Sequence, residues 1–234
     1  MKKHIPNLIT LLNLLSGLFA VIYALDGDLI MAAFYIVLGI LFDFFDGFAA
    51  RILNVSGELG KQLDSLADMV TSGVAPAMIL LKLIEKSTEG NSEFLPIIGL
   101  LFALAAAYRL ANFNIDTRQT SSFIGLPTPA ATLVVISLPL ILHLDSNYNT
   151  IVNLINNPYV LIGITITLSI LMNAEIPLFS LKFKNFTLKD NKIVYLFLAI
   201  SVLLLVLLQF IAIPLIIFLY VAISLLPIIK KNRN

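Results

Sequence analysis

Four aspartates at fixed spacing are the residues of this chain whose types and positions best suit chemistry. Asp43 precedes Asp46 by three positions, Asp64 precedes Asp68 by four, and strongly apolar sequence flanks both pairs. Ionisable side chains are costly within hydrocarbon and are normally retained there for function. In two antiparallel helices joined by a short link near 54–58, each pair lies on one helix face, so the four carboxylates can point towards one another.

Such a cluster favours the binding of divalent cations. Unneutralised carboxylates repel one another, and they take up protons or bind cations in response. Oxygen ligands suit Mg²⁺, Mn²⁺ or Ca²⁺ rather than zinc, and the chain has no cysteine. Mg²⁺ often combines a few carboxylates with the phosphate oxygens of a substrate. Gly47 and Gly60 leave room for a bulky ligand, and the guanidinium of Arg51 can bind a phosphate.

Two other interpretations of the charged cluster stay open. The charges could form an interfacial salt-bridge network that caps two helices, or they could form the ion site of a cation transporter. Transporter sites commonly lie near the bilayer centre, at broken helices in repeated halves. This cluster instead falls towards one end of its apolar segments, and no internal repeat is visible. The combination of four aspartates with an arginine and two glycines therefore favours a binding site.

The composition indicates an all-α integral membrane protein. The 234 residues are 59% hydrophobic and 12% charged, which is too apolar for a soluble domain. The net charge of +1 gives no case for a nucleic-acid partner. The N-terminal residues lead into a long apolar run without a small-residue cleavage site, so we expect a first spanning helix rather than a cleaved signal. We interpret residues 1–234 as a single membrane domain.

Hydropathy divides the chain into about eight expected transmembrane helices, at roughly 20 apolar residues per crossing. They cover residues 5–24, 29–52, 59–84, 94–113, 126–144, 159–173, 193–210 and 212–229. The sixth is the shortest, and the link between the last two is very tight.

The distribution of Lys and Arg predicts the orientation of this bundle. Of the 15 Lys and Arg residues, only Lys82 and Lys86 fall on one side of the expected helices. The other side, which includes Arg118 and the basic segment 182–192, should face the cytoplasm together with both termini. The aspartate cluster then lies at the cytoplasmic end of the second and third helices.

The residues around the cluster form one continuous pattern, Asp43-x2-Asp46-Gly47-x2-Ala50-Arg51-x8-Gly60-x3-Asp64-x3-Asp68. This pattern resembles the signature of the CDP-alcohol phosphatidyltransferase family at every fixed position. In that family a CDP-linked lipid donates its phosphatidyl group to an alcohol, and two divalent metal ions, Mg²⁺ or Mn²⁺, sit among the aspartates. The resemblance therefore implies a membrane-embedded transferase.

The same resemblance assigns roles residue by residue. It makes Asp43, Asp46, Asp64 and Asp68 the metal ligands, and Asp68 also the base that takes the proton of the acceptor hydroxyl. Gly47, Arg51 and Gly60 would line the CDP pyrophosphate. The stretch Pro6-Asn7-Leu8-Ile9-Thr10 is similar to the family's first helix, which contributes to the nucleotide pocket, so Asn7 and Thr10 become substrate-binding candidates. Proline alone at this position would indicate only a helix start.

Later stretches resemble the phosphatidylserine synthase branch of the family. They are residues 63–77, 108–114, 123–131 and 173–182. Asn112 stands where that branch usually has a second arginine, so no acceptor-binding role is carried over to that position. The small residues at 71–73 would also suit close helix packing without any catalytic role.

Arg109, at the cytoplasmic end of an apolar helix, has two open interpretations. Its side chain either extends to the lipid headgroups or pairs at the site with an acceptor carboxylate or a lipid phosphate. We keep it as a substrate-binding candidate.

The branch resemblance implies transfer of the phosphatidyl group from CDP-diacylglycerol to the hydroxyl of L-serine, giving phosphatidylserine and CMP. Glycerol 3-phosphate or inositol phosphate stay alternative acceptors, because the core signature is common to all these enzymes. A phosphorylated acceptor should need an extra basic cluster, and only Lys61, Arg109 and Arg118 are available, which favours serine. The resemblance further implies a homodimer, which we expect in the inner (cytoplasmic) membrane.

Overall fold

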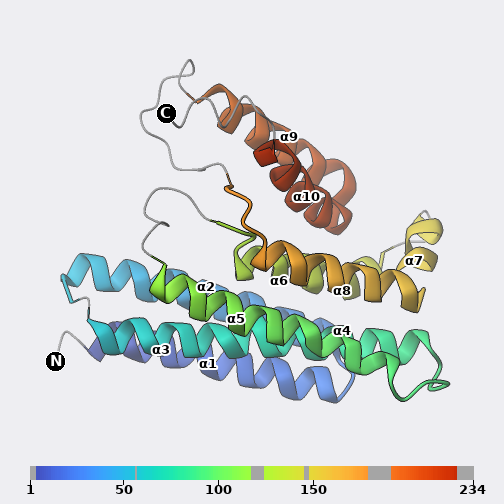
Figure 1. Ribbon diagram of the computed structural model, residues 1–234, viewed down its shortest axis with the longest axis horizontal. Helices are drawn as coiled ribbons and strands as arrows, with labels where there is room; N and C mark the ends of the chain where they lie inside the picture. Colours follow the sequence, from blue (N-terminus) through green and yellow to red (C-terminus); the bar gives the residue numbers. More distant parts are fainter. Residues whose placement is uncertain (1–3, 56, 117–123, 145–147, 179–190, 226–234) are drawn as a thin grey trace.

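The computed structural model describes residues 4–55, 57–116, 124–144, 148–178 and 191–225 (Figure 1). In these ranges the chain is helical, and extended pairing is limited to one isolated antiparallel bridge between Ile124 and Pro177. This confirms the expected all-α membrane fold. Arg118, most of the basic segment 182–192 and parts of the stretches at 123–131 and 173–182 lie outside the described residues.

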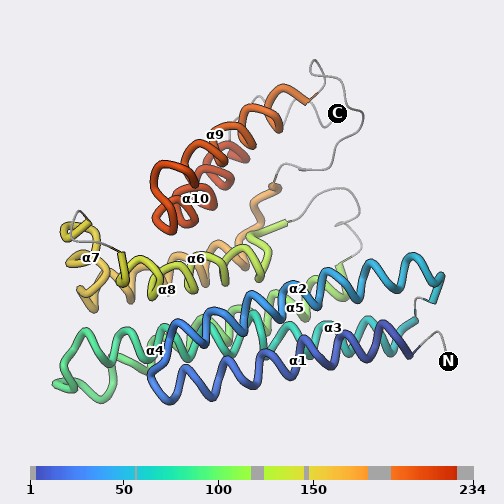
Figure 2. Tube along the Cα trace, turned by 180° about the vertical axis from the view of Figure 1, so that it is seen from behind, coloured from blue at the N-terminus to red at the C-terminus, as the bar shows by residue number. Residues whose placement is uncertain are grey.

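The N-terminal half of the chain forms one layer of long helices that lie side by side in Figures 1 and 2. The elements of this layer are α1 (His4–Leu25), α2 (Leu29–Leu53), α3 (Glu58–Asp68), the π-helical turn η1 (Met69–Val74), α4 (Ala75–Ser87), the 3-10 turn η2 (Leu95–Leu100) and α5 (Leu101–Ile115). The elements α3, η1 and α4 are continuous, and so are η2 and α5. These apolar segments fold as helices because a helix satisfies every backbone polar group within hydrocarbon.

The C-terminal half adds two further groups of helices above this layer (Figure 1). The first comprises α6 (Thr128–Ile141), α7 (Asn149–Ile155) and α8 (Pro158–Asn173), and the second comprises α9 (Lys192–Leu208), the 3-10 turn η4 (Gln209–Ile211) and α10 (Ala212–Leu225). Helices α6 and α8 contact α4 and α5, whereas the α9–α10 hairpin reaches the rest of the molecule mainly through α10 against α6. Gln209, at φ 50°, ends α9 and gives the expected tight link.

Each of the eight expected segments corresponds to helix, but the number of membrane crossings is a separate matter. Five helical stretches among the described residues are long and apolar enough to cross a membrane, namely His4–Leu25, Leu29–Leu53, Glu58–Ser87, Leu95–Ile115 and Lys192–Leu225. A sixth follows if α7 and α8, which are bent by 72° at their junction, form one span. Helix α6 is shorter, so the count of eight crossings stays a prediction.

Small residues bring α1, α2 and η1 into close contact around Thr71. Thr71 is fully buried, and its hydroxyl donates a hydrogen bond of 3.1 Å to the backbone oxygen of Asn13 on α1. A Cβ on Gly39 of α2 would lie 2.5 Å from Thr71 Cγ2 and 2.9 Å from Asn13 Oδ1, and a Cβ on Gly17 of α1 would overlap Thr71 Oγ1. This contact fixes α1 and α2 against the helix that carries the second aspartate pair.

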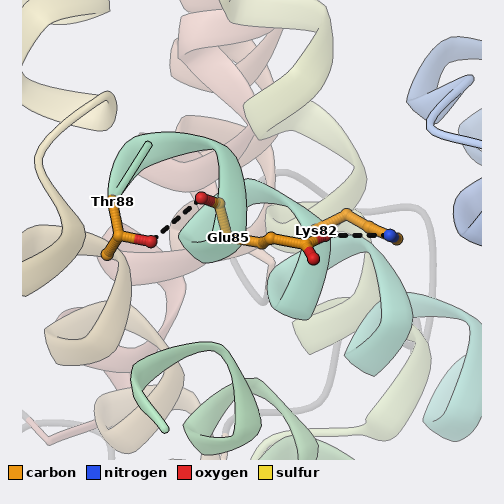
Figure 3. A network of polar contacts seen from close by, with 3 residues as sticks. All are labelled: Lys82, Glu85 and Thr88. Atoms are coloured by element: carbon orange, nitrogen blue, oxygen red, sulfur yellow. Dashed lines mark hydrogen bonds and ion pairs between the residues drawn. The ribbon is translucent and has the colours of Figure 1, made fainter. Parts of the chain in front are cut away.

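The C-terminal end of α4 carries a small polar network of its own (Figure 3). Lys82 Nζ lies 2.8 Å from Glu85 Oε2, and the hydroxyl of Thr88 donates a bond of 2.9 Å to the backbone oxygen of Glu85. The network lies at the opposite end of the continuous Glu58–Ser87 helix from the aspartates. The network pairs Lys82, one of the two basic residues that the sequence analysis places on the side opposite the cytoplasm.

We predict that Gly39→Ala destabilises the protein by about 1–3 kcal/mol, the usual cost of overpacking a close contact. Thermal unfolding of the detergent-solubilised protein measures this effect. Gly163→Ala in α8 is the matched control, because a Cβ there meets nothing within 4 Å. Equal unfolding temperatures for the two variants would contradict the close-packing interpretation.

Candidate active site

Asp43 of α2 and the pair Asp64 and Asp68 of α3 converge at one place. One carboxylate oxygen from each of the three lies within 4.8 Å of the other two, and all three side chains are partly buried. The convergence follows from the turn between the helices. Asn54 adopts a left-handed conformation (φ 51°) that ends α2, the backbone N–H of Val55 bonds Ala50 O, and α3 begins at Glu58.

Asp46 lies at the edge of this cluster and is the most buried of the four, with 6% of its surface exposed. Its Oδ2 is 2.6 Å from the hydroxyl of Thr10 on α1, which also lies 3.0 Å from the backbone oxygen of Pro6. Asp46 is close enough to Asp64 and Asp68 for their charges to interact. The structure therefore brings Thr10 and all four aspartates into one neighbourhood.

Helix α1 contributes a second polar contact that the sequence analysis missed. Asn13 is completely buried, and its Nδ2 donates a hydrogen bond of 3.2 Å to Asp68 Oδ1. Asn7, Thr10 and Asn13 recur every third residue, which places them near one face of a helix. That polar face on an otherwise apolar helix is the signal that could have identified Asn13.

The two signature glycines lie in different surroundings. A Cβ on Gly60 would lie 3.3 Å from Asn7 Oδ1, so this glycine sits directly beside Asn7. A Cβ on Gly47 would meet no described residue within 4 Å. Arg51 is exposed, and its Nε donates a bond of 3.0 Å to Gly47 O one turn earlier in the same helix. The structure thus leaves open space at Gly47 but does not bring Arg51 into contact with the carboxylates.

Arg109 of α5 is buried, with 7% of its surface exposed, so the interpretation that it extends to the lipid headgroups is wrong. Its Nε donates a bond of 2.8 Å to Leu126 O, and its guanidinium lies 5.6 Å from the ring centre of Phe113. Arg109 is close enough to Asp68 for the two charges to interact. Its Nη2 is buried and has no hydrogen-bond partner among the described residues.

The donor set of the cluster fits a divalent cation. Asp64 Oδ1 is buried and has no hydrogen-bond partner in the part of the chain that the structure describes, and Asp64 belongs to the group of three carboxylates described above. Between described residues, the ion pair within 4.0 Å is that of Lys82 with Glu85, so no basic side chain there forms an ion pair with the aspartates. The salt-bridge interpretation therefore fails for these residues, and crowded carboxylate oxygens are the ligands that Mg²⁺ and Mn²⁺ prefer.

Comparison with known proteins agrees with this reading of the site. A family model described as CDP-alcohol phosphatidyltransferase matches residues 3–172, a range that contains every candidate site residue. The chain is 39% identical over 140 residues to the CDP-diacylglycerol–serine O-phosphatidyltransferase of Bacillus subtilis, covering 58% of this chain and 75% of that one. It is 32% identical over 197 residues to the Helicobacter pylori enzyme of the same name (83% and 80% covered). An archaetidylserine synthase of Methanothermobacter thermautotrophicus is 34% identical over 137 residues (57% and 56%).

We predict that Asp64→Asn weakens Mn²⁺ binding by at least about tenfold, since changing even an outer partner of a metal ligand typically costs 10- to 100-fold. The variant should also unfold at a higher temperature than wild type in chelator, because one of the repelling charges is gone. Electron paramagnetic resonance of free Mn²⁺ and thermal unfolding measure the two effects.

The control for this experiment is Asp26→Asn, which removes an exposed carboxylate in the link between α1 and α2. It should change neither Mn²⁺ binding nor stability in chelator. An unchanged Mn²⁺ affinity in Asp64→Asn would rule out Asp64 as a ligand.

Proposed function

The chain belongs to the CDP-alcohol phosphatidyltransferase family, and on that basis we propose that it transfers the phosphatidyl group of CDP-diacylglycerol to the hydroxyl of L-serine, releasing CMP. The observation that carries the proposal is the convergence of Asp43, Asp64 and Asp68, with Asp46 at their edge. Thr10 and Asn13 of α1 bond Asp46 and Asp68. Serine as the acceptor is supported by the activity for which the Bacillus subtilis and Helicobacter pylori relatives are named.

The aspartates would hold the divalent cations of the reaction, two Mg²⁺ or Mn²⁺ ions by resemblance to the family. The ligands would be Asp43, Asp46, Asp64 and Asp68. Bound cations of this kind offset the charge of the pyrophosphate and the charge that develops on the leaving nucleotide. The buried, unpartnered Asp64 Oδ1 supports this assignment.

Asp68 is the proposed base. As the serine hydroxyl oxygen attacks the lipid-side phosphorus, Asp68 accepts the hydroxyl proton, the new P–O bond forms, and CMP departs with the electrons of the broken pyrophosphate bond. Asn13 Nδ2 holds Oδ1 of this carboxylate and so leaves Oδ2 to receive the proton. The signature offers no Ser, Cys or His nucleophile beside a base, which supports direct displacement over a covalent intermediate.

The nucleotide would occupy the space between the ends of α1, α2 and α3. The open volume beside Gly47 supports this placement, as does the position of Asn7 against Gly60. Thr10 keeps the carboxylate of Asp46 in place by its short hydrogen bond. Arg51 would reach the pyrophosphate by releasing its bond to Gly47 O, because its guanidinium is exposed at this end of α2.

Glycerol 3-phosphate and inositol phosphate are the alternative acceptors within the same chemistry. Lys61 is one of the few cations near the cluster, and its ammonium donates a hydrogen bond of 3.0 Å to Asn114 O. Arg109 is the buried cation near Asp68. A buried dianionic phosphate would need more than one cation to pair with it, whereas a single guanidinium can pair with one carboxylate, which supports serine. The position of the cluster at one end of its helices disfavours cation transport.

The protein would lie in the inner (cytoplasmic) membrane as a homodimer, with both termini and the active site on the cytoplasmic side. The orientation is supported by Lys82 and Lys86, the few basic residues at the far end of α4. The dimer rests on resemblance to the family alone.

We predict that detergent-purified protein releases CMP from CDP-diacylglycerol only when L-serine and Mg²⁺ or Mn²⁺ are present, and that chelator abolishes the release. Asp68→Asn should lower kcat by about 10²–10⁴-fold, the usual contribution of a general base, while Asp26→Asn should act as wild type. Release of CMP with glycerol 3-phosphate or inositol phosphate instead of serine would agree with the mechanism but contradict serine as the acceptor. Near-normal turnover by Asp68→Asn, with donor and metal still bound, would exclude Asp68 as the base.

We predict that single-cysteine labelling will show the aspartate cluster on the cytoplasmic side. The chain suits this measurement because it has no native cysteine. Asn91→Cys, exposed beyond α4, should react with a membrane-impermeant maleimide in intact cells. Glu58→Cys, exposed at the start of α3, should react only after permeabilisation. The reverse pattern would place the aspartate cluster on the outer side.

A further inference from the structure

Among the described residues, three buried polar groups without hydrogen-bond partners belong to elements that meet at the start of α6. They are Ser72 Oγ of η1, Arg109 Nη2 of α5 and Thr128 Oγ1 of α6. The exposed fractions of these residues are 1%, 7% and 0%, and the three elements that carry them contact one another. A buried polar group left unpaired costs about 1–3 kcal/mol. Several such groups in one place therefore indicate a ligand or an ordered water.

Two hydrogen bonds place the residues that carry these groups near the first two turns of α6. The hydroxyl of Thr132 donates a bond of 2.8 Å to Ser72 O, and Thr132 lies one helical turn beyond Thr128 on the same face of α6. On the other side, Arg109 Nε donates to Leu126 O at 2.8 Å, two residues before Thr128. The start of α6 is thus tied to η1 by one bond and to α5 by the other.

This group of side chains lies next to Asp68. Ser72 follows Asp68 by four positions, and the π-helical turn η1 starts directly after Asp68. Short π-helical turns are rare and occur frequently at functional sites. Arg109 is also close enough to Asp68 for the two charges to interact.

The chemistry of the group suits a carboxylate. Two hydroxyls and a guanidinium can all donate hydrogen bonds, and the guanidinium is always positive. Thr128 is the first residue of α6, so the partial positive charge of the helix N-terminus lies beside it. Pro127, which precedes it, provides no side-chain cap. All three groups can donate a hydrogen bond, and none of them has a partner among the described residues.

We propose that Ser72 and Thr128, together with Arg109, bind the carboxylate of the amino-acid acceptor and so determine its selection. This inference rests on the proposed function, in which Asp68 receives the proton of the acceptor hydroxyl. One helical turn, about 5 Å, separates Ser72 from Asp68 along the helix. In L-serine the carboxylate and the hydroxymethyl group share one carbon, so the acceptor can place its carboxylate at this group and its hydroxyl at Asp68.

The test measures KM for L-serine and for CDP-diacylglycerol separately in the full-length protein carrying Ser72→Ala or Thr128→Val. Each variant should raise the KM for serine by about tenfold or more, the range expected for a lost hydrogen bond to a charged group. The KM for CDP-diacylglycerol should stay at its wild-type value, and the unfolding temperature should not fall, because the hydroxyl that is removed has no partner among the described residues. Ethanolamine, which is serine without its carboxylate, should be a poor acceptor for wild type, and neither variant should lower its use further.

Two matched variants separate this role from a packing effect. Thr165→Val removes a hydroxyl that is equally buried but bonded to Leu161 O at 2.8 Å within α8, and it should leave both KM values unchanged. Thr128→Ser retains the hydroxyl and should retain the wild-type KM for serine. A rise with Thr128→Ser as large as that with Thr128→Val would overturn the assignment, because the hydroxyl would not be its cause.

The remaining outcomes distinguish this inference from the proposed function. If wild type uses serine and both Ser72→Ala and Thr128→Val have the wild-type KM for serine, the inference alone is overturned. Ordered water would then satisfy the buried groups. A rise in the KM for CDP-diacylglycerol instead would assign these groups to the lipid phosphate. Wild type that uses glycerol 3-phosphate but not serine would overturn the proposed acceptor and the carboxylate assignment with it.

Discussion

The mutual repulsion of carboxylates held close together is the constraint on which the rest of this structure depends. Two unit charges about 5 Å apart repel by about 3 kcal/mol at an effective dielectric constant of about 20. Asp43, Asp64 and Asp68 approach one another at this distance, and no basic side chain of the described residues lies within 4.0 Å of them. Helix packing elsewhere must therefore hold α2 and α3 together against the repulsion at their facing ends.

Helix α1 meets this requirement and also serves the site. Its backbone accepts the hydroxyl of Thr71, its glycine at position 17 lets η1 approach closely, and its side chains Thr10 and Asn13 bond Asp46 and Asp68. The packing contact and the two polar contacts come from the same helix, so a shift of α1 would move both aspartates. Helix α1 is therefore both a packing element and part of the candidate active site.

The opposite wall of the site depends on contacts that are distant in sequence. Gly125, at φ 73°, has its N–H bonded to Ile176 O at 2.9 Å, and a Cβ there would lie 2.5 Å from Met172 O. The next residue, Leu126, provides the carbonyl that holds Arg109. The turn before α6 is thus fixed by the end of α8, and it in turn orients the buried guanidinium next to Asp68.

The sequence by itself determined the helices, the four aspartates and the turn between their two helices. Hydropathy and residue spacing are local, and in hydrocarbon a helix is the way to satisfy the backbone. Only the tertiary structure decided that Asn13 bonds Asp68, that Arg51 remains on its own helix, and that Arg109 is buried against Leu126 O beside Ser72 and Thr128. These contacts join residues far apart along the chain, and they depend on how the helices rotate and approach one another, which no local pattern specifies.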